Sequence, residues 1–274
     1  LVILSSPFFS SATSAQQFEW GGLPALPGEL GFGGPFAGTH NGALIVAGGA
    51  NFPTGMPWEG GDKVWYDDIY VLEDGDTAWS SESSLPHAMA YGISISTPSG
   101  VMVVGGSDAS AVYADVWLLG WNSDTKSISI DTLPSLPMAS AFHAGALVDG
   151  VVYVAAGQKS TDATDLNHAF WAMDVSGAVE SWAWVSKSAW PGDARIKAVA
   201  AAQADGSDKI FFYLFSGEIP TTTDAGEVTL NYVTDGYRYD PSEDAWSAMA
   251  ALDKPVAAAR AIDVGQSHIV VFSG

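Results

Sequence analysis

The sequence predicts an all-β fold, a propeller built from repeated four-stranded units, and three observations support this prediction. A run of β-branched or aliphatic residues that ends in small residues recurs five times, as in "ALIVAGG" and "VMVVGG". The runs recur at steps of 57, 51, 60 and 57 residues, because their last glycines are Gly49, Gly106, Gly157, Gly217 and Gly274. No stretch of a dozen residues carries the clean apolar stripe of an amphipathic helix.

Each repeat is expected to form one blade of four short strands, since the step is near the roughly 50-residue period of Kelch-type propeller blades. The recurring apolar run is the second strand, and an aromatic-bearing third strand follows the next loop, as in "DDIYVLE" and "ADVWLLG". A fourth strand brings a tryptophan in three repeats, Trp79, Trp184 and Trp246, and lacks one in the second. Proline-containing links then lead to a first strand of small residues, such as "YGISIS". The Ala-rich segment 194–204 is interpreted as another such inner strand.

The small pairs have a physical explanation in this fold. Blades converge near the propeller axis, so the end of each second strand has little room for side chains. A glycine there lets the backbone turn without a Cβ clash. The third and fourth strands form the outer hairpin, where their aromatic side chains are expected to pack between neighbouring blades.

The repeat count predicts a six-bladed Kelch-type propeller of which this sequence holds four full blades and parts of two others. Trp20, followed by "LPALP", has the pattern of the last strand of a blade, and Gly274 ends the second strand of the fifth repeat. Propellers close by pairing one terminus into the blade begun by the other, which removes exposed sheet edges. By the repeat arithmetic, roughly 80–100 residues are expected to be absent.

The composition excludes several classes of partner and chemistry. The formal charge is −21, with 31 acidic and 10 basic side chains, and the pI is about 4.1, so we expect no binding to nucleic acid or to anionic membranes. The chain has no cysteine, which excludes disulfides, a thiolate nucleophile and a cysteine-ligated zinc site. No apolar run reaches the roughly 18 residues that a membrane helix needs.

The first 15 residues differ in character from the rest. Their apolar stretch, followed by small residues around Thr13 and Ala15, is typical of the end of a secretory signal with cleavage after Ala15. We therefore interpret 1–15 as a signal peptide remnant and 16–274 as the Kelch propeller domain, in a soluble protein that is secreted or periplasmic. The alternative is a disordered or tag-like tail.

Long stretches of the sequence resemble a known family. The segment "LPALPGELGFGGPFAGTHNGALIVAGGANFPTGMPWEGGDKVWYDDIYVLE", together with "AYGISIST", "GGSDASAVYADVWLL", "VTDGYRYDP" and "GQSHIVVFSG", is similar to the cyclically permuted mutarotases, which are related to N-acetylneuraminate epimerases. The resemblance implies a six-bladed Kelch propeller that interconverts the anomers of a small sugar acid, sialic acid. The different starting point of the permuted blade order is consistent with the isolated strand expected at Trp20.

The implied reaction needs only acid–base chemistry. A base takes the proton of the anomeric hydroxyl and an acid protonates the ring oxygen, so that the ring opens, the ketone rotates and the ring closes again. We expect no cofactor and no metal, and the sequence has no zinc-protease, P-loop or dinucleotide motif. The "EDGD" run at 73–76 predicts an Asp-Gly hairpin turn rather than a calcium loop. The alternative function is a noncatalytic Kelch module that binds a glycan or a protein.

The resemblance also implies a catalytic Glu directly after a small-Gly pair, with an Arg a few residues later. Glu218 in "FSGEIP" matches the first part of this pattern, but no Arg follows before Arg238. The blade register aligns this repeat with a noncatalytic blade and places the family's Glu and Arg beyond Gly274. Glu218 is therefore a candidate proton carrier, with a residue at the rim of the pocket as the other interpretation.

Topology predicts which other residues surround one mouth of the central channel. These are residues that follow the small pairs and residues that begin the inner strands, namely Asn51, Ser107, Gln158 and Glu218, and Tyr91, His143, Arg195 and Arg260. The two arginines suit bidentate binding of a sialate carboxylate, and the alternative for each is a salt bridge to an Asp at a blade edge. For His143 the alternative is a hydrogen-bonded histidine of the core.

Overall fold

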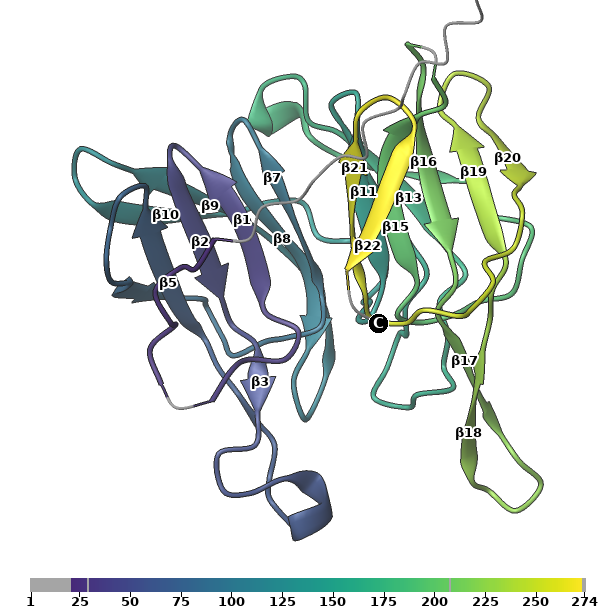
Figure 1. Ribbon diagram of the computed structural model, residues 1–274, viewed down its shortest axis with the longest axis horizontal. Coiled ribbons are helices and arrows are strands. Elements are labelled where there is room, and N and C mark those ends of the chain that lie inside the picture. The colour runs from purple at the N-terminus through teal and green to yellow at the C-terminus, as the bar shows by residue number, and fades with distance from the viewer. Residues whose placement is uncertain (1–20, 29, 207, 273–274) are drawn as a thin grey trace, which may run out of the picture.

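The computed structural model describes residues 21–28, 30–206 and 208–272, and its strands form a series of blades (Figure 1). Four sheets of four antiparallel strands follow one another along the chain. The first sheet contains β1 (Phe36–His40), β2 (Ala43–Ala47), β5 (Asp68–Glu73) and β6 (Ser80–Ser84). The second contains β7 (Ile93–Thr97), β8 (Gly100–Ser107), β9 (Val112–Asn122) and β10 (Ser127–Thr132). The third contains β11 (Ala144–Val148), β12 (Val151–Ala155), β13 (Phe170–Asp174) and β14 (Trp184–Lys187). The fourth contains β15 (Val199–Ala204), β16 (Ile210–Phe215), β19 (Gly236–Asp240) and β20 (Ala245–Ala248).

Three further pairs of strands complete the described part of the chain. β21 (Arg260–Val264) and β22 (His268–Phe272) are the inner pair of a fifth unit. Two hairpins, β3 (Ala50–Asn51) with β4 (Val64–Trp65) and β17 (Glu218–Thr222) with β18 (Val228–Tyr232), are inserted after second strands. Both hairpins project from the same side of the molecule, at the bottom of Figure 1. Two single-turn 3-10 helices span Pro57–Glu59 and Val179–Ser181.

The all-β, Kelch-type architecture and the four full blades are confirmed. The Ala-rich segment does contain an inner strand, β15. The strand expected at Trp20 and the signal remnant expected at 1–15 both lie outside the described residues.

The inner strands β1, β7, β11, β15 and β21 lie next to one another in that order and form the wall of a central channel. Serine side chains from β7 cover the edge of β1, because Ser94 Oγ accepts from Ala37 N at 2.9 Å and donates to Ala37 O at 2.7 Å. Ser96 Oγ likewise accepts from Thr39 N at 2.8 Å. The edge of β1 is thus satisfied by hydroxyls rather than by another strand.

The two small residues at the end of each second strand let the backbone turn where a larger side chain would clash with its neighbours. Both residues of the pair Gly105–Gly106 have positive φ, 54° and 131°. A Cβ at Gly106 would lie 2.7 Å from the carbonyl oxygen of Ala90. Ala156 and Ser216 hold the first position of later pairs with similar φ values of 68° and 57°, so the second position is the one that requires glycine.

In three of the four blades, a tryptophan of the outer hairpin bonds to the preceding unit. The indole of Trp184 donates to Pro134 O at 2.9 Å, and that of Trp246 donates to Ser188 O at 2.8 Å. Both acceptors lie just after the outer strand of the preceding blade. Trp79 makes the same bond to Pro24 O at 2.8 Å, which places "LPALP" in the corresponding position before the first described blade.

Candidate functional site at the channel mouth

A cavity of about 840 Å³ fills the space between the inner strands. Small and aliphatic residues such as Ala146, Ala200 and Ala261 make up most of its wall. Charged groups are few, and the cavity is lined by Lys197, Arg260 and Asp263. Aromatic side chains, Tyr91 and Phe142, lie at the end where the inner strands begin.

One residue per unit stands just before each inner strand in the left-handed backbone conformation. These residues are Gly34, Tyr91, Phe142, Lys197 and Ala258, with φ between 54° and 66°. Their main chains form a continuous belt, because Tyr91 N donates to Gly34 O (2.9 Å), Phe142 N to Tyr91 O (2.6 Å), Lys197 N to Phe142 O (2.8 Å) and Ala258 N to Lys197 O (3.0 Å). Left-handed backbone is costly for bulky side chains and is concentrated at functional sites, so the belt marks the mouth as a candidate site.

The belt brings two aromatic rings and a lysine together. Tyr91 and Phe142 stack with their ring centroids 4.7 Å apart and an interplanar angle of 22°. The ammonium of Lys197 lies 5.7 Å from the centroid of the Phe142 ring. Burial raises the pKa of Tyr91 above its ordinary value, so its phenol stays protonated.

Glu218 lies beside this group as the first residue of β17. Its side chain is almost fully buried, and its residue is 2% exposed. Oε1 accepts a 2.5 Å hydrogen bond from Lys197 Nζ. The backbone N–H and C=O of Glu218 both bond to Ile196, which precedes Lys197. A carboxylate in a tight ion pair is thus held at the mouth by two neighbouring strands.

Lys63, from the β3–β4 hairpin, completes the mouth. Its ammonium lies 4.2 Å from the centroid of the Tyr91 ring, 5.0 Å from that of Trp65 and 5.9 Å from that of Phe52. Burial lowers the pKa of Lys63, and the positive charge of Lys197 lowers it further. No ion pair involves Lys63 within residues 21–28, 30–206 and 208–272.

The residues expected after the small pairs are found at the mouth with one shift of register. Ser107, Gln158 and Glu218 form isolated bridges with Ala90, Ala141 and Ile196, each next to a residue of the belt. In the first blade the bridge is made by Ala50 instead of Asn51. Asn51 lies one residue further along, where Oδ1 accepts from Tyr66 OH at 2.8 Å. Ser107 and Gln158 are buried, and Gln158 Nε2 donates to Ser160 O.

Of the residues expected to begin the inner strands, Tyr91 alone occupies the belt. His143 follows the belt residue Phe142, is buried at 5% exposure and lines the cavity. Burial lowers its pKa to about 4, so it is a neutral histidine of the core. Its burial fits the alternative of a core histidine, and hydrogen bonds with the backbone of Val104 and Ser140 raise its pKa by less than burial lowers it. Arg260 follows Ala258 by two residues, lines the channel and is exposed to it.

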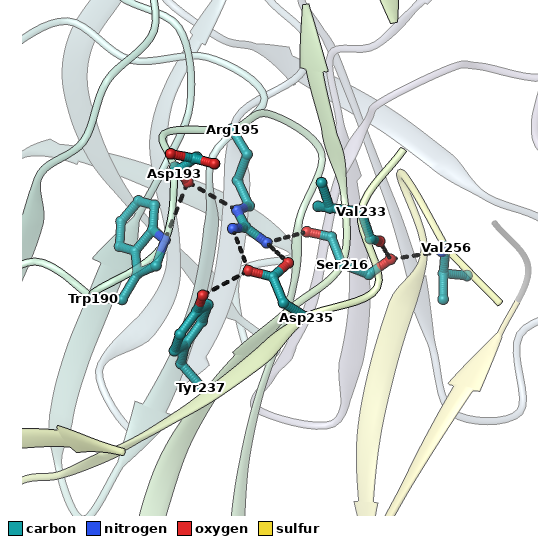
Figure 2. A network of polar contacts seen from close by, with 8 residues as sticks. All are labelled: Trp190, Asp193, Arg195, Ser216, Val233, Asp235, Tyr237 and Val256. Atoms are coloured by element: carbon teal, nitrogen blue, oxygen red, sulfur yellow. Dashed lines mark hydrogen bonds and ion pairs between the residues drawn. The ribbon is translucent and has the colours of Figure 1, made fainter. Parts of the chain in front are cut away.

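Arg195 is not available to a ligand, and the prediction that it binds a carboxylate is wrong. Figure 2 shows its guanidinium enclosed by Asp193, Ser216 and Asp235. Nη1 and Nη2 donate to the two carboxylate oxygens of Asp235 at 2.6 and 2.8 Å, while Nε and Nη1 donate to the carbonyls of Asp193 and Ser216. The residue is 1% exposed, and Asp235 is the aspartate partner that was the alternative. The hydrogen bonds from Arg195 lower the pKa of Asp235.

Sequence reasoning missed three residues of the mouth: Lys63, Phe142 and Lys197. Phe142 and Lys197 each lie two residues before the start of a small-residue inner strand, as Tyr91 does, and this position was the available signal. Lys63 belongs to a long inserted hairpin, and no repeat count could locate it. Among the described residues no group of three or more His, Asp or Glu could hold a metal ion, and residues 73–76 form the hairpin turn between β5 and β6.

The fold and the mouth define the chain as a Kelch-type β-propeller with a charged and aromatic site on its channel. Among solved structures it is similar to that of YjhT, with a TM-score of 0.70 and 15% identity over 91% of this chain and 79% of the other. A family model described as N-acetylneuraminate epimerase matches residues 8–130, so the resemblance to that family is confirmed over this part of the chain.

Curated relatives show the same relationship. The chain is 35% identical over 125 residues to the N-acetylneuraminate epimerase of Vibrio cholerae, which is 40% of this chain and 32% of that protein. It is 35% identical over 122 residues to the N-acetylneuraminate epimerase of Brucella melitensis, 40% of this chain and 30% of that protein. The match thus spans about a third of the length of these relatives. In the described part of the chain no helix is long and apolar enough to cross a membrane.

Proposed function

We propose that the protein interconverts the anomers of sialic acid at the channel mouth, by acid–base ring opening and closure. The observation that carries the proposal is the ion pair of the buried Glu218 with the partly exposed Lys197, beside the stacked rings of Tyr91 and Phe142. The relatives named N-acetylneuraminate epimerase support the choice of sialic acid. In line with a signal remnant at 1–15, we place the reaction in a secreted or periplasmic protein.

Glu218 is assigned as the base and Lys197 as the acid. The Glu218 carboxylate takes the proton of the anomeric hydroxyl while the Lys197 ammonium gives a proton to the ring oxygen, so the C–O bond of the ring breaks and the open keto form results. After the ketone rotates, the neutral amine and the carboxylic acid act in the reverse sense and the ring closes on the other face. Ring closure thus restores the carboxylate and the ammonium, and the hydrogen bond between them holds the two groups side by side for the next cycle.

This assignment differs from the blade register expected from the family, in which the base lies beyond Gly274. Geometry favours Glu218, because it is a buried carboxylate at the mouth with an acid partner within hydrogen-bond distance. Proton transfer by a positioned group contributes typically 10²–10⁴-fold in rate. Removal of the Glu218 carboxylate should therefore cost about that factor.

The test is the rate of α-to-β exchange of freshly released N-acetylneuraminate, followed by NMR in the presence of a chelator. Glu218→Gln should slow the exchange by about 10²–10⁴-fold. The matched control is Glu227→Gln, since Glu227 is an exposed carboxylate at the tip of the same hairpin and should be without effect. A Glu218→Gln protein within about tenfold of the original rate would place the base elsewhere.

The alternative function is a noncatalytic module that binds a glycan or a protein. Binding of N-acetylneuraminate without any acceleration of anomer exchange by the unaltered protein would favour this alternative. Loss of exchange with chelator would instead contradict metal-free chemistry.

A further inference from the structure

Lys63 is held in an arrangement that leaves its charge unpaired within the described residues. Three aromatic rings, those of Phe52, Trp65 and Tyr91, lie within 5.9 Å of its ammonium. The chain carries 31 carboxylates against 10 basic residues, and the described ion pairs include seven of its other Lys and Arg side chains. A lysine without a carboxylate in so acidic a protein requires an explanation.

A second ammonium lies close to Lys63. The charge of Lys197 acts on Lys63, and both ammonium groups lie near the same stack, Lys63 by the Tyr91 ring and Lys197 by the Phe142 ring. Like charges in proximity are unfavourable, and Glu218 offsets one of the two. The mouth therefore keeps one excess positive charge next to a flat apolar surface.

We propose that Lys63 and Lys197 form a carboxylate-binding subsite at the channel mouth and select the anionic form of the sugar. The proposal rests on the proposed function and adds to it the residues that recognise the acid group. It also replaces Arg195, whose guanidinium is buried and bonded to Asp235 and two carbonyls.

The donor count supports such a subsite. An ammonium has three N–H donors, and Lys197 uses one of them on Glu218. Within residues 21–28, 30–206 and 208–272 the Lys63 ammonium makes no hydrogen bond, so its donors face the mouth or its aromatic neighbours. A carboxylate has two oxygens and can accept from both lysines, while the stacked faces of Tyr91 and Phe142 contact the apolar side of a sugar ring.

The competing explanation is that Lys63 only fastens the β3–β4 hairpin to the mouth through its aromatic contacts. Lys63→Met separates the two explanations, because Met keeps an unbranched apolar chain against the rings and removes the charge. Lys63→Arg keeps the charge. The matched control is Lys254→Met, which removes an exposed lysine from the link before β21.

The experiment is a titration of each protein with N-acetylneuraminate and with its methyl ester, in which the carboxylate is masked. The unaltered protein should bind the acid more tightly than the ester. In Lys63→Met, affinity for the acid should fall by about tenfold or more while affinity for the ester stays the same. Lys63→Arg should retain most of the preference for the acid, and Lys254→Met all of it.

Equal losses for acid and ester in Lys63→Met would overturn the subsite in favour of the fastening role. Unchanged affinity for the acid in that variant would overturn it as well. The outcome is independent of catalysis, because binding and exchange rate are measured separately. A protein that binds the acid through Lys63 but does not accelerate exchange would support the subsite and contradict the proposed reaction.

Discussion

The side chains of Lys197 and Glu218 share a 2.5 Å hydrogen bond, and the residue before Lys197, Ile196, exchanges two backbone hydrogen bonds with Glu218. The backbone bonds at Ile196 hold the main chain of Lys197 beside that of Glu218, so the two side chains lie within reach of each other. Such preorganisation is what an acid–base pair requires.

The ion pair should be important for stability as well as for reaction. Lys197→Met leaves a carboxylate that is 2% exposed without its cation, and we expect the free energy of unfolding to fall by about 2 kcal/mol, less than for a fully buried pair because Lys197 is partly exposed. Adding Glu218→Gln should recover part of the loss. Urea denaturation of the four proteins of this double-mutant cycle measures the coupling. Losses that simply add would show that the pair contributes nothing.

The pair of Arg195 and Asp235 is expected to be structural only. Asp235→Ala should destabilise the protein by about 2–4 kcal/mol, because it leaves a guanidinium at 1% exposure without its bidentate partner. Thermal unfolding monitored by circular dichroism reports the change. The preference for N-acetylneuraminate over its methyl ester should persist in the folded variant, and its selective loss would return Arg195 to the binding site.

His143 should make stability depend on pH in a defined window. Burial lowers its pKa from 6.5 to about 4, so the unfolded chain binds a proton before the folded protein does as the pH falls. The free energy of unfolding should therefore decrease between about pH 6.5 and pH 4, by up to roughly 3 kcal/mol. Urea titrations across this range should show the decrease, and the difference between the original protein and His143→Leu isolates it. Asp108, with a pKa lowered to about 2 by hydrogen bonds that outweigh its burial, contributes at lower pH. Parallel pH profiles for the two proteins would contradict the expectation.

The second glycine of a small pair should be irreplaceable. Gly106→Ala would combine a φ of 131° with a Cβ placed 2.7 Å from Ala90 O, and we expect a loss of about 3–5 kcal/mol. Gly75 is the control, since its φ is 86° but no atom lies within 4 Å of an added Cβ. Gly75→Ala should cost only about 1 kcal/mol. Chemical denaturation of both variants decides the matter, and similar losses would mean that backbone conformation rather than space accounts for the glycine.

The blades were predictable because their signal is repeated and local. Each apolar run ending in a small pair became a second strand, and the tryptophans Trp79, Trp184 and Trp246 do bridge to the preceding unit. The mouth was less predictable because one residue of error in the register changes which side chain reaches it. Asn51 was one residue late, and His143 was taken in place of its neighbour Phe142.

Long-range pairing explains the remaining differences. Arg195 was predicted to bind the carboxylate of a ligand, but Asp235, 40 residues later in the sequence, forms an ion pair with it in the folded protein. The position of Lys63 depends on how a hairpin folds back over the Tyr91 ring. Neither contact leaves a periodic pattern in the sequence, so neither could be read from spacing.

At the belt, main-chain hydrogen bonds hold neighbouring units together, while the side chains of the same residues supply the chemical groups of the mouth. Since the bonds of the belt itself involve only main-chain N–H and C=O groups, the side chains at Tyr91, Phe142, Lys197 and Ala258 can differ from unit to unit, and they do. Each of these units thus places one position whose side chain can vary at the mouth of the channel. A propeller of this kind can acquire a new specificity by substitution of a few of these side chains, while the main-chain hydrogen bonds of the belt stay as they are.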